Sequence, residues 1–78
     1  MRTERITSAQ HPLYAQAMEV YRNSFPPHEQ REAASQERIL HDSAYHFTAV
    51  YDGDVFVELV LYWETEAHLY IEHAALAV

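Results

Sequence analysis

The chain has 78 residues, a formal net charge of −7 and no cysteine, which together exclude several kinds of protein. All five cationic side chains are arginine, so the chain lacks the basic face with which a nucleic-acid binder displaces counterions from phosphates, and we expect no nucleic-acid partner. The acidic balance suits a cationic substrate such as an amine. Without cysteine there is no disulfide and no thiolate metal site, and an apolar fraction of 49% indicates one small folded domain rather than a disordered chain.

The amino terminus has no feature of a targeting or membrane segment. Residues 1–10 lack the apolar core of a signal peptide, and no stretch approaches the roughly 18 apolar residues of a membrane span. We therefore expect a cytoplasmic protein without a membrane partner.

Residues 5–7 are predicted to form a short first strand.

Two helices are predicted to follow. His11 and Pro12 open the first helix, because proline suits the first helical position, where its missing N–H is not needed. The sequence Phe-Pro-Pro at residues 25–27 ends this helix near Asn23 or Ser24. Residues 28–42 are rich in Glu, Gln, Arg and Ala, which are good helix formers, and they are predicted to form the second helix.

From residue 45 onward the chain is aromatic and β-branched, which predicts three antiparallel strands. Residues 45–51 and 55–63 form the first two, and Asp52 and Gly53 between them are a strong signal for a tight hairpin. Residues 68–78 form the third. Its alternation of apolar and polar residues changes near residues 73–75, which is compatible with a β-bulge there.

The strand at residues 55–63 is apolar on both of its faces. Strict alternation places Val55, Val57, Leu59, Leu61 and Trp63 on one face, and Phe56, Val60 and Tyr62 on the other with Glu58 and Glu64. Such a strand is expected at the centre of a sheet that is covered on both sides. The apolar residues 74–78 would leave an adhesive edge, so we expect either a fragment or a partner that covers this edge.

Three segments of the chain are similar to segments of one known family. The sequence SFPPHEQR at residues 24–31 is similar to an "SFPP-x-E-x-R" segment that links two helices, and FTAVYDG at residues 47–53 resembles the strand and turn of the hairpin that follows. YIEH at residues 70–73, which leads to LAV at residues 76–78, resembles a fourth strand. The chain thus resembles the first half of the GNAT fold of N-acetyltransferases. The fold class expected is α+β, with a short first strand, two helices and a three-strand antiparallel meander.

The chain also departs from this family in two respects. The Q/R-x-x-G-x-G/A loop and the helix after it hold the pyrophosphate of acetyl-CoA on backbone N–H groups. The only glycine of the sequence is Gly53, in the hairpin, and Glu58 stands where many relatives have a small residue. We therefore expect residues 1–78 to be a partial N-acetyltransferase domain that is inactive alone.

The resemblance implies which residues carry the chemistry of acetyl transfer from acetyl-CoA to an amine by direct attack. Glu72 and His73 are the two candidates for the general base that the amine needs. They point to opposite faces of a regular strand, so only one of them is expected to face the acceptor. The backbone N–H of Leu76 would polarise the acetyl carbonyl, and Ala77 and Val78 would pair with the pantetheine arm.

The resemblance places the amine acceptor, a small molecule or a peptide, over the segment that joins the two helices. Phe25, Pro26 and Glu29 of that segment are expected to contact it, with Trp63 and Tyr70 as walls. Each residue also has a structural interpretation. Phe25 and Pro26 end a helix, and aromatic residues such as Trp63 and Tyr70 are more often part of a core or an interface.

Other functions remain open at this point. The main alternative is a small non-catalytic α+β module that dimerises or binds a partner, such as a missing carboxy-terminal half, through its open last strand. A truncated product without a function of its own is a third interpretation. We expect no metal site, because the pairs His41 with His46 and His68 with His73 lack the spacing of a helical zinc motif.

Overall fold

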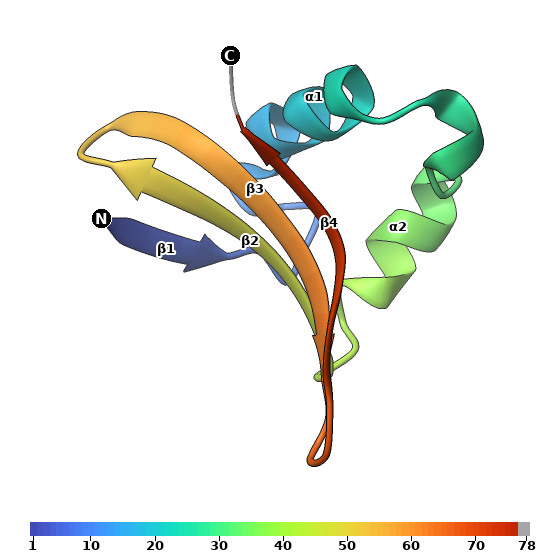
Figure 1. The fold of residues 1–78 in the computed structure, drawn as a ribbon. Helices are drawn as coiled ribbons and strands as arrows, with labels where there is room; N and C mark the ends of the chain where they lie inside the picture. The colour runs from blue at the N-terminus through green and yellow to red at the C-terminus, as the bar shows by residue number, and fades with distance from the viewer. Residues whose placement is uncertain (77–78) are drawn as a thin grey trace.

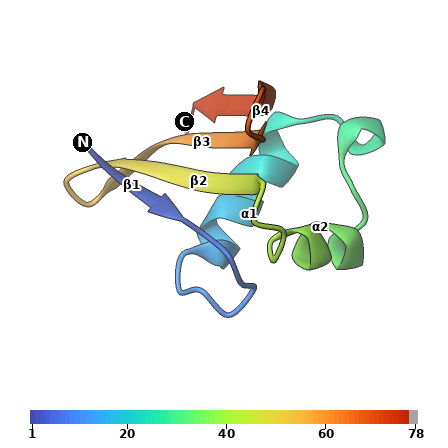
Figure 2. The same ribbon diagram turned by 90° about the horizontal axis from the view of Figure 1, so that it is seen from below.

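The computed structural model describes residues 1–76 and confirms an α+β fold. In chain order the elements are β1 (Arg2–Arg5), α1 (Tyr14–Ser24), a 3₁₀ turn (Pro27–Glu29), α2 (Ala33–Ile39), β2 (Tyr45–Asp52), β3 (Val55–Glu64) and β4 (Leu69–Leu76). The strands form one antiparallel sheet in the order β1-β2-β3-β4. Both helices lie on the same side of this sheet (Figures 1 and 2). Among the described residues, no helix is long and apolar enough to span a membrane.

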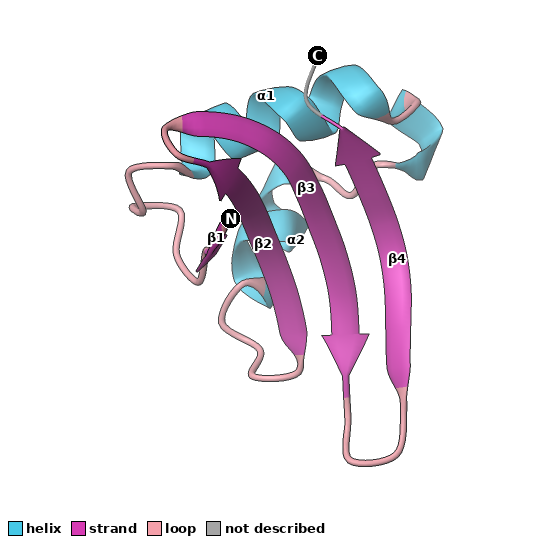
Figure 3. Ribbon diagram, turned by 60° about the vertical axis from the view of Figure 1, so that its left-hand side comes forward, coloured by secondary structure: helices cyan, strands magenta, loops and turns pink. Residues whose placement is uncertain are grey.

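The core lies between the helices and the face of the sheet that they cover. Side chains of α1, β2 and β3 supply most of it, and its members share an exposure of 8% or less. They are Ile6, Ala17, Met18, Tyr21, Leu40, Tyr45, Phe47, Ala49, Tyr51, Phe56, Leu59 and Leu61. The strands β2, β3 and β4 run side by side in front of the helices (Figure 3). A strand that alternates every second residue can bury one face only, which is the pattern that β2 shows.

The first helix begins two residues later than the sequence predicts. Pro12 lies in a turn, in which the N–H of Tyr14 donates to the carbonyl of His11 at 3.0 Å. The N–H of Leu13 donates to Nδ1 of His11 at 3.0 Å, so the imidazole satisfies an amide that a helix starting at Pro12 would leave free. The predicted end at Ser24 is confirmed.

The second helix is much shorter than the predicted range 28–42. Pro27 begins a 3₁₀ turn instead, and Gln30 follows it in an extended conformation. The side-chain amide of Gln30 donates to the carbonyl oxygens of Phe25 at 2.7 Å and Arg22 at 3.2 Å. The side chain of Gln30 thereby gives hydrogen-bond partners to carbonyl oxygens at the end of α1. The second helix, α2, starts only at Ala33.

The first strand lies nearer the amino terminus than predicted. It spans Arg2–Arg5 rather than residues 5–7 and pairs with β2 from Arg2 opposite Tyr51 to Arg5 opposite Thr48. Ile6 follows the strand, is 1% exposed and donates its N–H to the carbonyl of Phe47 at 2.8 Å. The position of this strand in the sequence is therefore set by its long-range pairing with β2.

The hairpin between β2 and β3 is confirmed, but the strand after it contains a bulge. Gly53 has a φ of 60°, the positive value that glycine tolerates best, and Asp52 pairs with Val55 across the turn. The register then shifts, because Tyr51 faces Phe56 while Val50 faces Glu58. This shift turns Phe56 toward the core beside Leu59 and Leu61, so its predicted placement on the opposite face is wrong.

The sheet face opposite the helices is not covered by any element of residues 1–76 (Figure 2). On this face Thr48 of β2, together with Val60 and Tyr62 of β3, is only half-buried. The prediction that β3 is covered on both sides is therefore wrong for the described part of the chain. The prediction that it is an interior strand is confirmed, because it pairs with β2 and β4.

Candidate functional site

A second bulge, in β4, determines how the two candidate bases point. Leu61 pairs with His73 and Tyr62 pairs with Ile71, so Glu72 is an extra residue between them. An extra residue interrupts the alternation of a strand, and both Glu72 and His73 turn toward the helices. The expectation that they face opposite sides is therefore wrong. The bulge, predicted at residues 73–75, lies at Glu72 instead.

Glu72 is held by side chains from two other elements. The two terminal guanidinium nitrogens of Arg31, Nη1 and Nη2, donate to its two carboxylate oxygens, and Nε1 of Trp63 donates to Oε2 at 3.0 Å. The side chains of Arg31 and Glu72 are 28% and 15% exposed. Burial raises the pKa of Glu72, but the hydrogen bonds from Arg31 and Trp63 outweigh burial and leave this pKa below its ordinary value. Glu72 is therefore an anion whose negative charge is balanced by the guanidinium of Arg31.

His73 lies against aromatic side chains at the end of α1. Its ring centroid is 4.2 Å from that of Phe25, and the two planes are inclined by 35°. The ring of Tyr21 meets the ring of His73 edge-on, with the two ring centroids 6.3 Å apart. These contacts connect β4 to the start of the segment between α1 and α2.

A buried hydrogen bond between α2 and β2 lies next to the ion pair of Arg31 and Glu72. Gln36 is fully buried, and its Nε2 donates to the hydroxyl oxygen of Tyr45 at 2.9 Å. The ring centroids of Tyr45 and Trp63 lie 4.7 Å apart. Cζ of Arg31 lies 5.6 Å from the centroid of the Tyr45 ring. Burial raises the pKa of Tyr45 to about 12, so its hydroxyl is neutral at ordinary pH. We call these side chains, Arg31, Gln36, Tyr45, Trp63 and Glu72, the Glu72 cluster.

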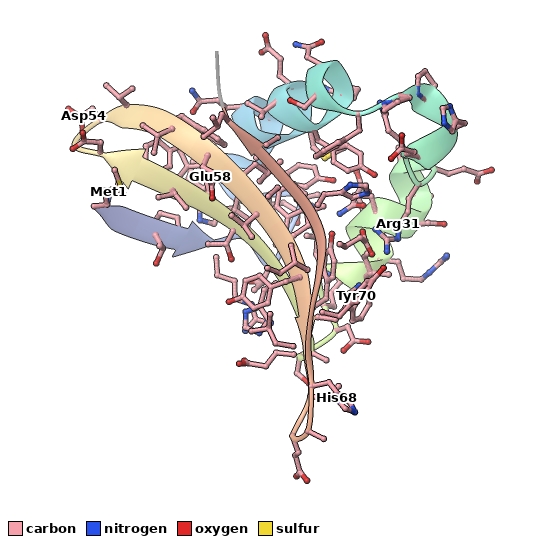
Figure 4. The ribbon with its side chains drawn as sticks, viewed as in Figure 1. Met1, Arg31, Asp54, Glu58, His68 and Tyr70 are labelled. Atoms are coloured by element: carbon pink, nitrogen blue, oxygen red, sulfur yellow. The ribbon has the colours of Figure 1, made fainter. Side chains whose placement is uncertain are left out.

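The predicted site residues separate into two groups in the structure. Phe25, Trp63, Glu72 and His73 come together on the helix side of the sheet, around the Glu72 cluster. The remaining described ones are exposed: Pro26, Glu29, Tyr70 and Leu76. Tyr70 pairs with Trp63 and so lies on the same side of the sheet, and it is labelled near Arg31 in Figure 4. Ala77 and Val78 lie outside the described residues.

Three members of the Glu72 cluster were not predicted. Arg31 ends the SFPPHEQR segment, so a signal for it was present in the sequence. Gln36 is one of several polar residues on a short helix, and nothing in the sequence marks it as the buried one. Tyr45 was expected only as a strand residue, and its hydroxyl gains a role because α2 packs over the start of β2.

A groove of about 560 Å³ lies apart from the Glu72 cluster, between α1 and the ends of β3 and β4. Among the predicted site residues only Leu76 lines it, and the charged side chains in its wall are Glu19 and Asp54. A wall with two carboxylates and no arginine does not suit the phosphates of acetyl-CoA. Among the described residues, no group of three or more His, Asp or Glu side chains is arranged to hold a metal ion.

Comparison with known proteins gives one strong structural similarity. No family model matches the sequence, and no curated protein matches it. Among solved structures, the chain is similar to a protein from Bacteroides thetaiotaomicron assigned to the GNAT family of acetyltransferases, with a TM-score of 0.86 and 27% sequence identity. The match covers 97% of this chain and 44% of that protein, so the chain spans less than half of its length.

Proposed function

We propose that the chain forms the acceptor side of an enzyme that transfers acetyl from acetyl-CoA to an amine. Its structural similarity to part of a protein assigned to the GNAT family of acetyltransferases supports this. In this reaction the amine loses a proton, its nitrogen forms a bond to the thioester carbonyl, and the CoA sulfur leaves with the electrons of the broken C–S bond. The single observation that carries the proposal is the structural similarity along nearly the whole chain.

We propose His73 as the base that accepts the proton of the amine. A general base works best when its pKa lies near the working pH, and imidazole is the side chain that ordinarily titrates there. The lowered pKa of Glu72 and its bonds to Arg31 and Trp63 argue against that carboxylate as the proton acceptor. Glu72, already paired with Arg31, would instead hold the bulge from which His73 projects.

The acceptor would lie beside the aromatic surface formed by Phe25 and Trp63. The support for this position is that both side chains are half-buried and contact the Glu72–His73 bulge directly. Pro26, Glu29 and Tyr70 are exposed and would form the rim.

The acetyl-CoA contacts rest on the family resemblance alone. The backbone N–H of Leu76 would polarise the acetyl carbonyl, and Ala77 and Val78 would run along the pantetheine arm. Within residues 1–78 no glycine-rich loop is present to bind the pyrophosphate. We therefore expect the 78 residues by themselves not to turn over acetyl-CoA.

Calorimetry with acetyl-CoA tests the proposal. The 78-residue chain is compared with a version extended at its carboxyl end, either by its own coding sequence or by the remaining part of the similar Bacteroides protein. We expect binding and amine-dependent release of CoA from the extended version only, with a loss of about 10²- to 10⁴-fold in kcat for His73→Asn. Binding by neither version would refute the proposal, and turnover by the 78 residues alone would refute the expected inactivity.

One observation favours a second function, a non-catalytic module that associates through β4. Within the described sheet β4 is an edge strand, and Leu69, Ile71 and Leu76 on it are between 58% and 71% exposed. An exposed apolar edge strand pairs readily with another strand. Light scattering distinguishes the two functions, because a monomer at high concentration would argue against association.

A further inference from the structure

The segment between α1 and α2, residues 25–32, is attached to its surroundings in two different ways. Most of its hydrogen bonds return to α1 or to the segment itself: Gln30 donates to the carbonyls of Arg22 and Phe25, and the N–H of Arg31 donates to the hydroxyl of Tyr21 at 3.1 Å. Within the described residues, the hydrogen bonds that join this segment to the sheet are those from Arg31 to Glu72. Arg31 is therefore the side chain that hydrogen-bonds the segment to β4.

The geometry of this connection requires arginine rather than any cation. Nη1 donates to Oε1 and Nη2 to Oε2, so the flat guanidinium fork meets the carboxylate with two parallel bonds. Nη1 also lies 3.5 Å from Oε1 of Gln36, and Cζ lies over the Tyr45 ring. A lysine offers one compact ammonium group and cannot reproduce the two bonds together with the contact to the ring.

The ion pair closes at the β4 bulge, next to the contact between His73 and Phe25. Glu72 is the extra residue of the bulge, so a force that fixes its carboxylate also fixes the backbone from which the imidazole of His73 projects. Phe25 lies on the same segment as Arg31 and rests on that imidazole at 4.2 Å. The ion pair and the ring contact together hold the segment and the bulge at one separation.

We propose that Arg31 is a positioning residue of the acceptor site, because its paired bonds to Glu72 hold the segment 25–32 against the β4 bulge and so hold His73 against Phe25. The assignment of this region as an acceptor site rests on the proposed function. The connection itself does not depend on it, and the test below therefore needs no acetyl-CoA.

Trp63 provides a direct probe of the connection. It is the single tryptophan of the chain, and its indole N–H donates to the same carboxylate that Arg31 holds. Its fluorescence therefore reports the ionisation of Glu72. The other charged or titratable groups near Glu72 are Arg31 from the segment, His73 from β4 and Tyr45 from β2.

The experiment compares the wild-type chain with Arg31→Met, Arg31→Lys, Glu72→Gln and a control, Arg38→Met. Arg38 is an exposed arginine on α2, and within the described residues its side chain hydrogen-bonds only to the hydroxyl of Ser35. Trp63 emission is followed from about pH 8 to about pH 3, a range that spans ordinary carboxyl titration near pH 4.3. Amide hydrogen exchange is measured at residues 28–32, since Pro26 and Pro27 have no backbone N–H.

We expect the emission step of the wild-type chain to lie below the ordinary carboxyl range and to disappear in Glu72→Gln. In Arg31→Met the step should rise by about one pH unit or more, because burial remains while the compensating bond is lost. Exchange at the backbone N–H of residue 31 should become about tenfold faster in Arg31→Met and in Glu72→Gln. Arg31→Lys should fall between these and the wild type, and Arg38→Met should match the wild type.

An unchanged emission step and unchanged exchange in Arg31→Met would overturn the proposal, since a residue that only fills space would not move the step. If Arg31→Met fails to fold, Arg31→Lys and Glu72→Gln decide instead, because both keep a long side chain at the site. Exchange at wild-type rates in both would overturn the proposal equally. A positive result here, with no acetyl transfer by the extended protein, would refute the proposed function and leave the connection established.

Discussion

Replacing Tyr45 by phenylalanine removes a single oxygen atom, and the structure indicates that this atom matters because of the group it leaves behind. The hydroxyl of Tyr45 accepts a hydrogen bond from Nε2 of Gln36 at 2.9 Å. Gln36 is fully buried and Tyr45 is 1% exposed, so water cannot replace the lost partner. The ring itself keeps its contact with Trp63.

The expected loss of unfolding free energy follows from the Gln36 side-chain amide, which Tyr45→Phe leaves without its hydrogen-bond partner. Leaving a buried polar group without a partner costs about 1–3 kcal/mol of unfolding free energy. For a domain of this size each kcal/mol lowers Tm by about 4–8 °C. Gln36→Met removes the donor instead and keeps the volume, and we expect a loss in the same range because it leaves the Tyr45 hydroxyl unpaired.

The double variant separates this explanation from a general loss of packing. With both polar groups gone no buried group lacks a partner, so the combined loss should be smaller than the sum of the single losses by about 1–2 kcal/mol. Urea unfolding followed by Trp63 emission and by circular dichroism measures all four proteins. Losses that add without any interaction would refute the reasoning.

Two further predictions concern single residues. Because the pKa of Tyr45 in the fold is about 12 and its ordinary value is 10.0, folding favours the protonated phenol. This contribution, about 2–3 kcal/mol, is complete below pH 10 and is lost as the pH rises toward 12. Tyr45→Phe should lack that alkaline loss, and equal urea midpoints against pH for both proteins would contradict the prediction. Gly53 has a φ of 60° with no atom within 4 Å of an added Cβ, so Gly53→Ala should cost about 1 kcal/mol through backbone strain alone. Gly53→Asn should cost less, and a Gly53→Ala chain as stable as the wild type would show that the turn relaxes.

The amino-acid sequence by itself determined those features that depend on local backbone chemistry. The end of α1 follows from the two prolines after Phe25, because proline has no N–H and restricts the residue before it. The hairpin follows from Gly53, which accepts a positive φ. The strand at residues 45–51 follows from its aromatic and β-branched residues. The resemblance of three short segments was also sufficient to indicate the fold that the structural comparison supports.

The directions of several side chains were decided only by the tertiary structure. The bulges of β3 and β4 arise from the register of one strand against its neighbour. The sequence of β4 indicated a bulge near residues 73–75 but not its position, and the sequence of β3 indicated none. These shifts bring Phe56 into the core and turn Glu72 and His73 to the same side. Strict alternation was therefore wrong at both places.

The Glu72 cluster depends most fully on the tertiary structure. Arg31 and Glu72 are 41 residues apart, and their bonds require the short α2, the extended residues before it and the β4 bulge to be in place together. Sequence patterns report periodicity within an element, whereas an ion pair between distant segments depends on where folding places those segments. Arg31 was visible in the sequence as part of a segment, but its partner, and with it the pKa of Glu72, was decided by packing.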